Sequence, residues 1–255
     1  MPKKRLIFTL LYQDNAFYLS RNFRLQRVGD LDWLRNNYKF TEIAKSIDEL
    51  VIIDVSRSSQ DKSRFCEVVV EVSGMCFMPL ALGGGINSIE DAAILINNGA
   101  EKLIINSAID TDPDLVRELV SIYGSQSIIG SIDYKIENGV TVPFINQGSE
   151  RVKSQFNDYV QHIYDLKVGE IYLNSIDRDG SGQGYIFDTL KDLGELAKVP
   201  IIVAGGAGNQ YHLKEALEMP EVDGAATANL FNFMGNGLPN ARRFLLEQGI
   251  PLAQW

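Results

Sequence analysis

The sequence predicts an α/β protein, a single (β/α)₈ TIM barrel that spans residues 1–255 and is built from two half-barrel repeats. Three observations predict this fold. Short apolar runs recur along the chain, and a helical pattern follows each of them. Two of these runs, together with the glycines after them, are near-copies half a chain apart. A length of 255 residues fits eight strand–helix units in one domain.

The internal repeat is the strongest of these signals. Segment 78–86 reads MPLALGGGI and segment 199–207 reads VPIIVAGGA, so that Pro79 and Pro200 lie 121 positions apart. Each copy is an apolar strand that runs into a glycine-rich turn and then into a helical pattern. Self-similarity at half the chain length predicts two halves of the same architecture.

The predicted strands are continuous apolar runs, which suit parallel strands buried on both faces. An open doubly wound sheet is the alternative, but the half-length repeat favours a closed barrel of two four-unit halves. The eight predicted strands are 6–11, 50–55, 78–82, 102–106, 127–132, 170–175, 199–204 and 224–228.

Amphipathic stretches between the strands predict helices. Ser88 and Asp112-Pro113 are typical helix starts. The clearest predicted helices are 88–98, 112–123, 155–167 and 187–198. The two longest loop-like insertions, 20–39 and 137–154, follow predicted strands, where a barrel places lids.

Composition excludes several classes of protein. A net charge of −9 argues against a nucleic-acid binder, which needs a basic face. No apolar run reaches the roughly 18 residues of a membrane span, and no signal peptide is apparent, so we expect a soluble cytoplasmic protein. The two cysteines, Cys66 and Cys76, form neither a disulfide scaffold nor a metal cluster. His162 and His212 fall in helical patterns, and we expect no metal and no cofactor.

The glycine turns are candidate phosphate sites. We call Gly84 and Gly85 the first glycine turn, and Gly205 and Gly206 the second. Glycines let backbone N–H groups approach a phosphate at a helix N-terminus. Glycines can also simply make tight turns, but two related turns after buried strands favour phosphate binding.

Further residues at strand ends extend this prediction. Asn106 ends the fourth predicted strand and Ser107 follows it, beside the first glycine turn. Ala228 and Asn229 follow the eighth, and the loops after strands seven and eight are the usual phosphate site of a barrel. These positions predict a phosphorylated small-molecule substrate.

Carboxylates also gather at predicted strand ends. Asp54, Asp133, Asp177 and Asp179 end or follow strands, and in a barrel such ends converge on one face. A carboxylate there can act as a general acid or base. The alternative for each is a capping or turn role, for example at Asp179-Gly180.

Together these motifs resemble the HisF family, the cyclase subunits of imidazole glycerol phosphate synthase. The resemblance covers nearly the whole chain. It rests on both glycine turns, on Ser131-Ile132-Asp133 and above all on the string Ser-Ile-Asp-Arg-Asp-Gly at 175–180. The related HisA isomerases share the half-barrel repeat but not this string.

The resemblance implies a lyase or cyclase of histidine biosynthesis that works as a heterodimer with a HisH-type glutaminase. Ammonia from glutamine would pass through the barrel to a phosphorylated substrate on the C-terminal face. The family's ammonia entrance is a charged ring, here matched by Arg5, Glu49, Lys102 and Glu170. A structural salt-bridge layer is the alternative for these four charges.

The remaining positions match the family residue by residue. Gln126 matches at the entrance, and Asp133 and Asp179 match catalytic positions. The implied phosphate and substrate positions are Gly84, Gly85, Asn106, Ser107, Asp177, Gly180, Gly205, Gly206, Ala228 and Asn229.

Departures from the family pattern open two alternatives. Leu11 stands where the family has its other catalytic aspartate, Leu19 replaces a lysine, and Asn229 replaces a serine, while Arg21 supplies charge near Leu19. Leu11 resembles HisF-like paralogues associated with acetamidino modification of a surface-polysaccharide sugar, which would make a sugar amidotransferase a possible further partner. A non-catalytic subunit that only activates a glutaminase is the other alternative.

Overall fold

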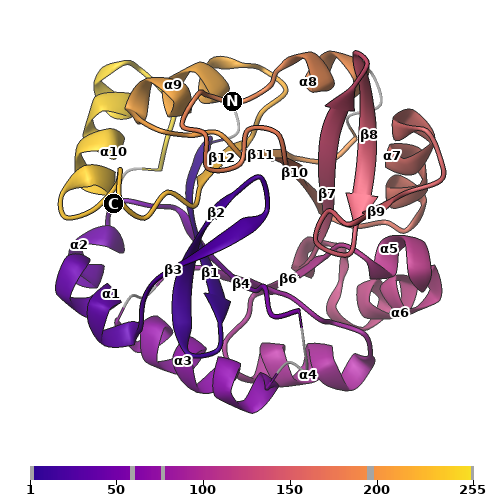
Figure 1. Ribbon diagram of the computed structural model, residues 1–255, viewed down its shortest axis with the longest axis horizontal. Helices are drawn as coiled ribbons and strands as arrows, with labels where there is room; N and C mark the ends of the chain where they lie inside the picture. The colour runs from indigo at the N-terminus through magenta and orange to yellow at the C-terminus, as the bar shows by residue number, and fades with distance from the viewer. Residues whose placement is uncertain (1–2, 58–60, 76–77, 194–197, 254–255) are drawn as a thin grey trace.

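The computed structural model describes residues 3–57, 61–75, 78–193 and 198–253. Eight parallel strands form a closed barrel with helices outside it (Figure 1). The pairing of β10 with β7 closes the circle, which excludes the open doubly wound sheet and confirms the predicted TIM barrel. The barrel strands are β1 (Arg5–Gln13), β4 (Glu49–Asp54), β5 (Leu80–Gly83), β6 (Lys102–Ile105), β7 (Ile128–Glu137), β10 (Glu170–Ser175), β11 (Ile201–Ala204) and β12 (Gly224–Thr227).

The helices begin where local sequence caps them. Ser88 accepts a hydrogen bond from Asp91 N, and Asp112 accepts one from Leu115 N ahead of Pro113. The stretch predicted as a helix at 187–198 is helical only over 188–193, and 194–197 lie outside the described residues. The helices are α1 (Leu31–Asn37), α2 (Phe40–Ile43), α3 (Lys62–Met75), α4 (Ile89–Asn97), α5 (Ala108–Thr111), α6 (Pro113–Tyr123), α7 (Phe156–Asp165), α8 (Asp188–Leu193), α9 (Gln210–Glu218) and α10 (Gly237–Glu247).

The predicted half-barrel repeat is visible in the elements. Strands β4 and β10, strands β5 and β11, and helices α4 and α9 have the same lengths in pairs and begin 121 positions apart. The N-cap residues Ser88 and Asn209 keep the same spacing. The two halves therefore present equivalent turns at the C-terminal ends of their strands.

The barrel interior is packed separately from the layer between strands and helices. Residues alternate along β1: Leu6 and Phe8 pack outward in the main core, whereas Ile7 joins a smaller inner cluster. The inner cluster also contains Val51, Ala81, Ile104, Ile129, Tyr172, Ile202, Ala204 and Ala226. The alanine side chains of this cluster fill little volume. The barrel interior therefore opens into a cavity at the C-terminal ends of the strands.

The expectation that 20–39 is loop-like was wrong. Strand β1 continues into an antiparallel hairpin of β2 (Ala16–Arg21) and β3 (Arg24–Gly29), and α1 follows. We call β2 and β3 the first hairpin; it lies across the barrel in Figure 1. Its two-residue turn, Asn22-Phe23, has positive φ at both positions, 50° and 60°, as in a type I′ turn.

The second insertion, 137–154, is also structured and contradicts the same expectation. Strand β7 turns at Asn138-Gly139 into β8 (Val140–Ile145), and β8 pairs with β9 (Glu150–Arg151). We call β7, β8 and β9 with their connecting turns the second hairpin; it lies beside the barrel opening in Figure 1. Asn-Gly is the strongest short hairpin signal, and here both residues have positive φ.

Other sequence features fall in the scaffold. Cys66 is buried in α3, and Cys76 lies outside the described residues. His162 contacts the Ile109 carbonyl, and His212 accepts a hydrogen bond from Gly208 N. In the described ranges, no helix is both long enough and apolar enough to cross a membrane.

Candidate active site at the C-terminal end of the barrel

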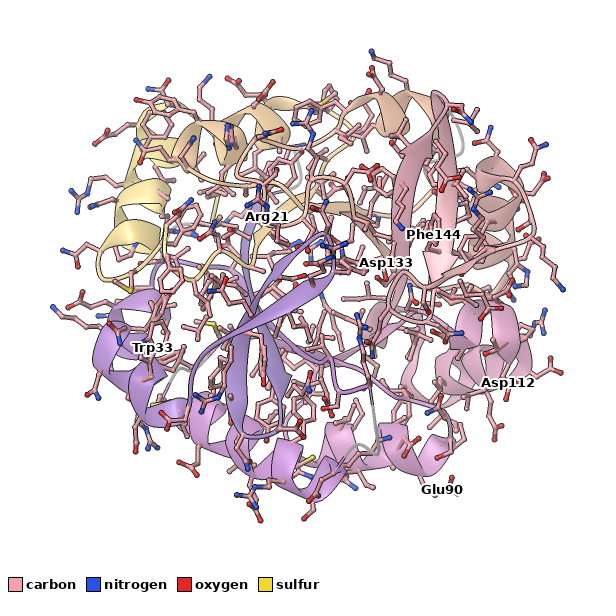
Figure 2. The ribbon with its side chains drawn as sticks, viewed as in Figure 1. Arg21, Trp33, Glu90, Asp112, Asp133 and Phe144 are labelled. Atoms are coloured by element: carbon pink, nitrogen blue, oxygen red, sulfur yellow. The ribbon has the colours of Figure 1, made fainter. Side chains whose placement is uncertain are left out.

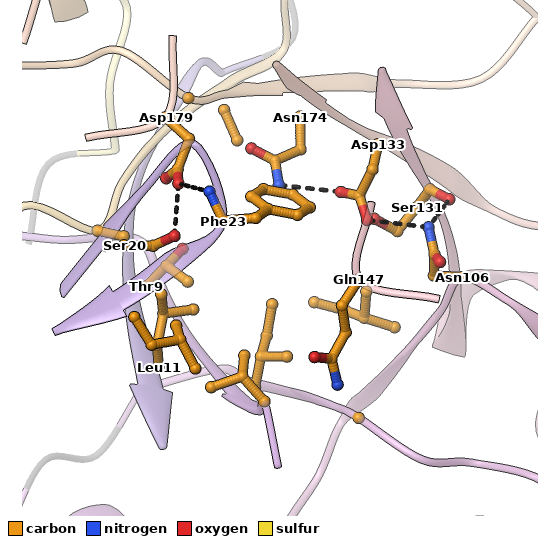
Figure 3. A pocket seen from close by; sticks show the side chains of 18 of the residues that line it. Thr9, Leu11, Ser20, Phe23, Asn106, Ser131, Asp133, Gln147, Asn174 and Asp179 are labelled. Carbon is orange, nitrogen blue, oxygen red and sulfur yellow. Dashed lines mark hydrogen bonds between the residues drawn. The ribbon is translucent and has the colours of Figure 1, made fainter. Parts of the chain in front are cut away.

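A cavity of about 940 Å³ opens at the C-terminal ends of the strands, under the two hairpins (Figure 3). It brings together nearly all the substrate and catalytic residues predicted for this face. The lining includes Gly84, Gly85, Asn106, Ser107, Asp133, Asp179, Gly180, Gly205, Gly206, Ala228 and Asn229. Asp177 does not line the cavity, because its carboxylate accepts a hydrogen bond of 2.7 Å from Ile136 N at the second hairpin.

Asp133 lies at the centre of the polar wall. Each of its carboxylate oxygens accepts a hydrogen bond from an amide: Oδ1 from Asn174 Nδ2 at 3.0 Å, and Oδ2 from Asn106 Nδ2 at 3.3 Å (Figure 3). Burial raises the pKa of Asp133 to about 7; the Asn174 hydrogen bond opposes this rise, and the charge of Asp179 adds to it. Both protonation states are therefore populated near neutral pH, as a proton-transfer group requires.

Asp179 holds the first hairpin over the cavity. Its Oδ2 accepts hydrogen bonds from Ser20 Oγ and from Phe23 N, and its backbone carbonyl accepts one from Asn22 N. Burial raises the pKa of this carboxyl group, and these hydrogen bonds oppose the rise. Asp179 thus lines the cavity and also anchors the first hairpin above it.

The strand register identifies the counterpart of Asp133 in the first half of the barrel. Asp133 pairs with Asn174, and Leu11 pairs with Ile53. Because Ile53 and Asn174 are 121 positions apart, Leu11 occupies the place that Asp133 has in the other half. The position of Asp133 therefore carries a carboxyl group that accepts hydrogen bonds from amides, whereas the equivalent position in the other half carries the apolar side chain of Leu11.

The glycine turns follow the same repeat. Gly84 and Gly205 have φ values of +103° and +82°, and a Cβ on either would lie 2.2 Å from Asp54 O or 2.4 Å from Ser175 O. Only glycine fits this backbone approach. In the part of the chain that the structure describes, the N–H groups of Gly85 and Gly206 donate no hydrogen bond, and helices α4 and α9 begin shortly after. Such N–H groups suit a phosphate oxygen.

A charged ring forms at the opposite end of the barrel. Arg5 contacts Glu49 and Glu170 at 2.9 Å each, and Lys102 contacts the same glutamates at 3.0 and 2.8 Å. The Glu49 side chain is only 2% exposed. Burial raises the pKa of Glu49, while Lys102 and Arg5 oppose that rise. Glu49 Oε1 has no hydrogen-bond partner among the described residues.

Gln126 is not part of this ring. It lies in a 3₁₀ turn, Ser125–Ser127, its side chain is exposed, and its amide donates a 3.4 Å hydrogen bond to Tyr123 O. No contact given for the described residues joins it to the four charges.

Sequence reasoning missed several residues that shape the site. Asn174 holds Asp133, and the hydroxyl groups of Thr9 and Tyr172 meet at 3.0 Å inside the apolar interior. Arg24 and Arg57 line the cavity mouth. The available signal was alternation: Thr9, Tyr172 and Asn174 are polar residues at inward-facing positions of otherwise apolar strands.

Fold and site define a class: a (β/α)₈ barrel with paired glycine turns and a buried carboxyl group on its C-terminal face. Among the described residues, no His, Cys, Asp or Glu side chains gather in threes that could hold a metal ion. A family model described as "Histidine biosynthesis protein" matches residues 37–236, and the chain belongs to this family.

Individual relatives place the chain more narrowly, as HisF-like. It is 42% identical, over all of this chain and 95% of the relative, to a Parasynechococcus marenigrum protein named "Putative imidazole glycerol phosphate synthase subunit hisF2". It is 36% identical to the imidazole glycerol phosphate synthase subunit HisF of Chlorobaculum parvum, over 98% of both chains. A HisF of Chlorobium limicola is 35% identical over 80% of this chain and 82% of its own.

Proposed function

We propose that this chain is a synthase subunit in which ammonia reacts with a phosphorylated substrate in the cavity, with Asp133 as the proton-transfer group. The observation that carries the proposal is the placement of Asp133 between the two glycine turns, with a pKa of about 7. Neutral ammonia that attacks an electrophilic carbon must lose a proton after the new C–N bond forms. The Asp133 carboxylate is the base that accepts it.

The charged ring is the proposed ammonia entrance. Its four charges encircle the end of the barrel opposite to the cavity, and the unpartnered Glu49 Oε1 offers a polar atom to a small hydrogen-bond donor. From the ring, ammonia would pass the small inner-cluster side chains Ala81 and Ala226 to reach Thr9 and Tyr172. The relatives are named as subunits, and we infer a HisH-type glutaminase as the partner of this face.

Leu11 favours a second candidate function within the same family. The histidine-pathway cyclisation would need a second proton-transfer group at this position, and leucine has none. A HisF-like paralogue that delivers ammonia for acetamidino modification of a surface-polysaccharide sugar, with a sugar amidotransferase as further partner, fits a one-acid site.

Complementation separates these two candidates. Expression of this chain with a HisH-type glutaminase in a cyclase-deficient histidine auxotroph should not restore growth without histidine. Growth would contradict the paralogue. The variant Leu11→Asp tests whether the missing carboxyl group is the cause. If this variant restores growth, the defect lies at residue 11.

Turnover of the reconstituted complex tests the role of Asp133. With ammonium as the nitrogen source, Asp133→Asn should lower product formation by about 10²–10⁴-fold, the usual contribution of a general acid or base. Ser149→Ala, at the cavity rim, is a matched control that should retain turnover. Unchanged turnover in Asp133→Asn would show that Asp133 is not the proton-transfer group.

A further inference from the structure

The tip of the first hairpin carries an unusual charge arrangement. Arg21 and Arg24 are directly paired across the two strands, on either side of the Asn22-Phe23 turn. Like charges in directly opposed positions destabilise a hairpin. Among the described residues, no carboxylate lies within ion-pair distance of either arginine. Both side chains are exposed and line the cavity, so their guanidinium groups are available to an anionic ligand.

A third arginine joins them at the same tip. Arg57 donates hydrogen bonds to Phe23 O at 3.2 Å and to Gln147 Oε1 at 3.0 Å. Arg21, Arg24 and Arg57 all line the cavity. Figure 2 shows Arg21 on the hairpin that crosses the barrel opening.

The tip is held in this position by the rest of the site. Asn22 Nδ2 donates to the carbonyls of Ile176 and Asp177 at 3.0 and 3.1 Å, and Phe23 N donates to Asp179. The Phe23 ring packs against Gly148 of the second hairpin, where an added Cβ would come within 2.9 Å of it. These hydrogen bonds and the Phe23 packing therefore hold the hairpin tip, and with it the arginines, at the cavity mouth.

We propose that Arg21, Arg24 and Arg57 form a third anionic subsite that binds a diphosphate group of the substrate. This deepens the proposed function and rests on it for the location of the reacting centre. The glycine turns can each take one phosphate through backbone N–H groups. Three guanidinium groups in a chain of net charge −9 add a separate site at the mouth. Guanidinium forks match the paired oxygens of a diphosphate.

Pyrophosphate binding measured by calorimetry tests the subsite. The double variant Arg21→Gln/Arg24→Gln should bind pyrophosphate at least about tenfold more weakly than the unmodified chain, at roughly threefold or more per exposed arginine. Arg27→Gln, on the same strand but off the cavity lining, is the matched control and should bind normally. Equal affinity in the double variant and the unmodified chain would overturn the proposal.

Inorganic phosphate separates the subsite from a general electrostatic effect. Phosphate held by the glycine turns should bind the double variant and the unmodified chain alike. Equal weakening of phosphate and pyrophosphate would also overturn the proposal. Adenosine and uridine diphosphates identify the source of the diphosphate: tighter binding than pyrophosphate indicates a nucleoside-linked substrate, and equal binding indicates the diphosphate alone.

A second variant protects the test against misfolding. Arg24→Glu places opposite charges across the hairpin, so its melting temperature should stay the same or rise while pyrophosphate binding falls. Unchanged binding in Arg24→Glu would count against the subsite. Asp133→Asn should bind pyrophosphate normally, so that failure of the ammonia chemistry and failure of the subsite are distinguished.

Discussion

Asp133 links folding stability to function at the scale of one residue. Its folded-state pKa of about 7 lies above the ordinary value of 3.8 because the carboxyl group is buried. For a carboxyl group whose pKa is raised on folding, the stabilising contribution is present at low pH and is lost as pH rises through the folded-state pKa. The charged form that a base requires is therefore the form that destabilises the barrel.

The variant Asp133→Asn should separate these two effects. Relative to the unmodified chain, its free energy of unfolding should increase between about pH 4 and pH 7, by on the order of a few kcal/mol in total, while turnover is lost. Urea titrations at pH 5 and pH 8 measure the difference. A stability gap that is the same at both pH values would contradict the raised pKa.

Asn174 adjusts the same carboxyl group. Its amide donates to Asp133 Oδ1 and favours the charged form. In Asn174→Leu, the pH midpoint of turnover should therefore move upward while substrate affinity changes little. Asn98→Leu, which loses an amide hydrogen bond to Ile94 O at the end of α4, is the matched control. A change in affinity alone, with an unshifted pH midpoint, would make Asn174 a substrate-binding residue instead.

At the scale of elements, the sequence predicts the barrel strands well and the hairpins poorly. Strand β10 was predicted to the residue, because a run buried on both faces is locally apolar. The turn Asn138-Gly139 was a recognisable hairpin signal that the loop expectation overlooked. Asn22-Phe23 was not recognisable: positive φ at Phe23 is held by Asp179, which lies 156 positions away.

The residues of the candidate site also fall into those that the sequence predicts and those that it does not. The glycine turns and Asp133 follow from residue type and strand end, whereas Asn174 and Arg57 become functional candidates only through contacts across the barrel. Gln126 was assigned only through the family resemblance, and its one side-chain hydrogen bond among the described residues, to Tyr123 O, leaves its role a prediction. Side-chain partners far apart in sequence cannot be read from local pattern.

The second glycine turn allows a prediction about an element. Gly205 and Gly139 have similar φ values, +82° and +79°, but a Cβ would lie 2.4 Å from Ser175 O at Gly205 and contact nothing within 4 Å at Gly139. Gly139→Ala should destabilise by about 1 kcal/mol through backbone strain. Gly205→Ala should destabilise by roughly 1–3 kcal/mol more through overpacking. Equal unfolding free energies for the two variants would refute the close-approach argument.

Across the whole molecule, the half-barrel repeat is preserved in the charged ring and the glycine turns, but not at the position of Asp133. Glu49 and Glu170 of the charged ring are 121 positions apart, as are Gly84 and Gly205. The positions of Leu11 and Asp133 are equivalent in register, but only Asp133 can transfer a proton. A duplicated scaffold suits a ligand with two similar ends, and in the proposed function the reaction takes place at Asp133 because leucine stands at the equivalent position.

The charged ring is the proposed ammonia entrance, and Glu49→Gln tests both this role and its contribution to stability. Loss of the buried carboxylate leaves Arg5 and Lys102 with only Glu170, which should destabilise the barrel by on the order of 3 kcal/mol. Glu71→Gln, which breaks the exposed pair of Glu71 with Arg35, is the matched control and should cost less than about 1 kcal/mol.

Activity distinguishes an ammonia entrance from a purely structural salt-bridge layer. If ammonia enters at the ring, Glu49→Gln in the complex with glutaminase should lower glutamine-dependent turnover more than ammonium-dependent turnover, because free ammonium can reach the cavity from its open mouth. Assays run well below the melting temperature of the variant keep the folded fraction constant. Equal loss with both nitrogen sources would assign the ring to stability alone, and the cavity would then receive its ammonia by another route.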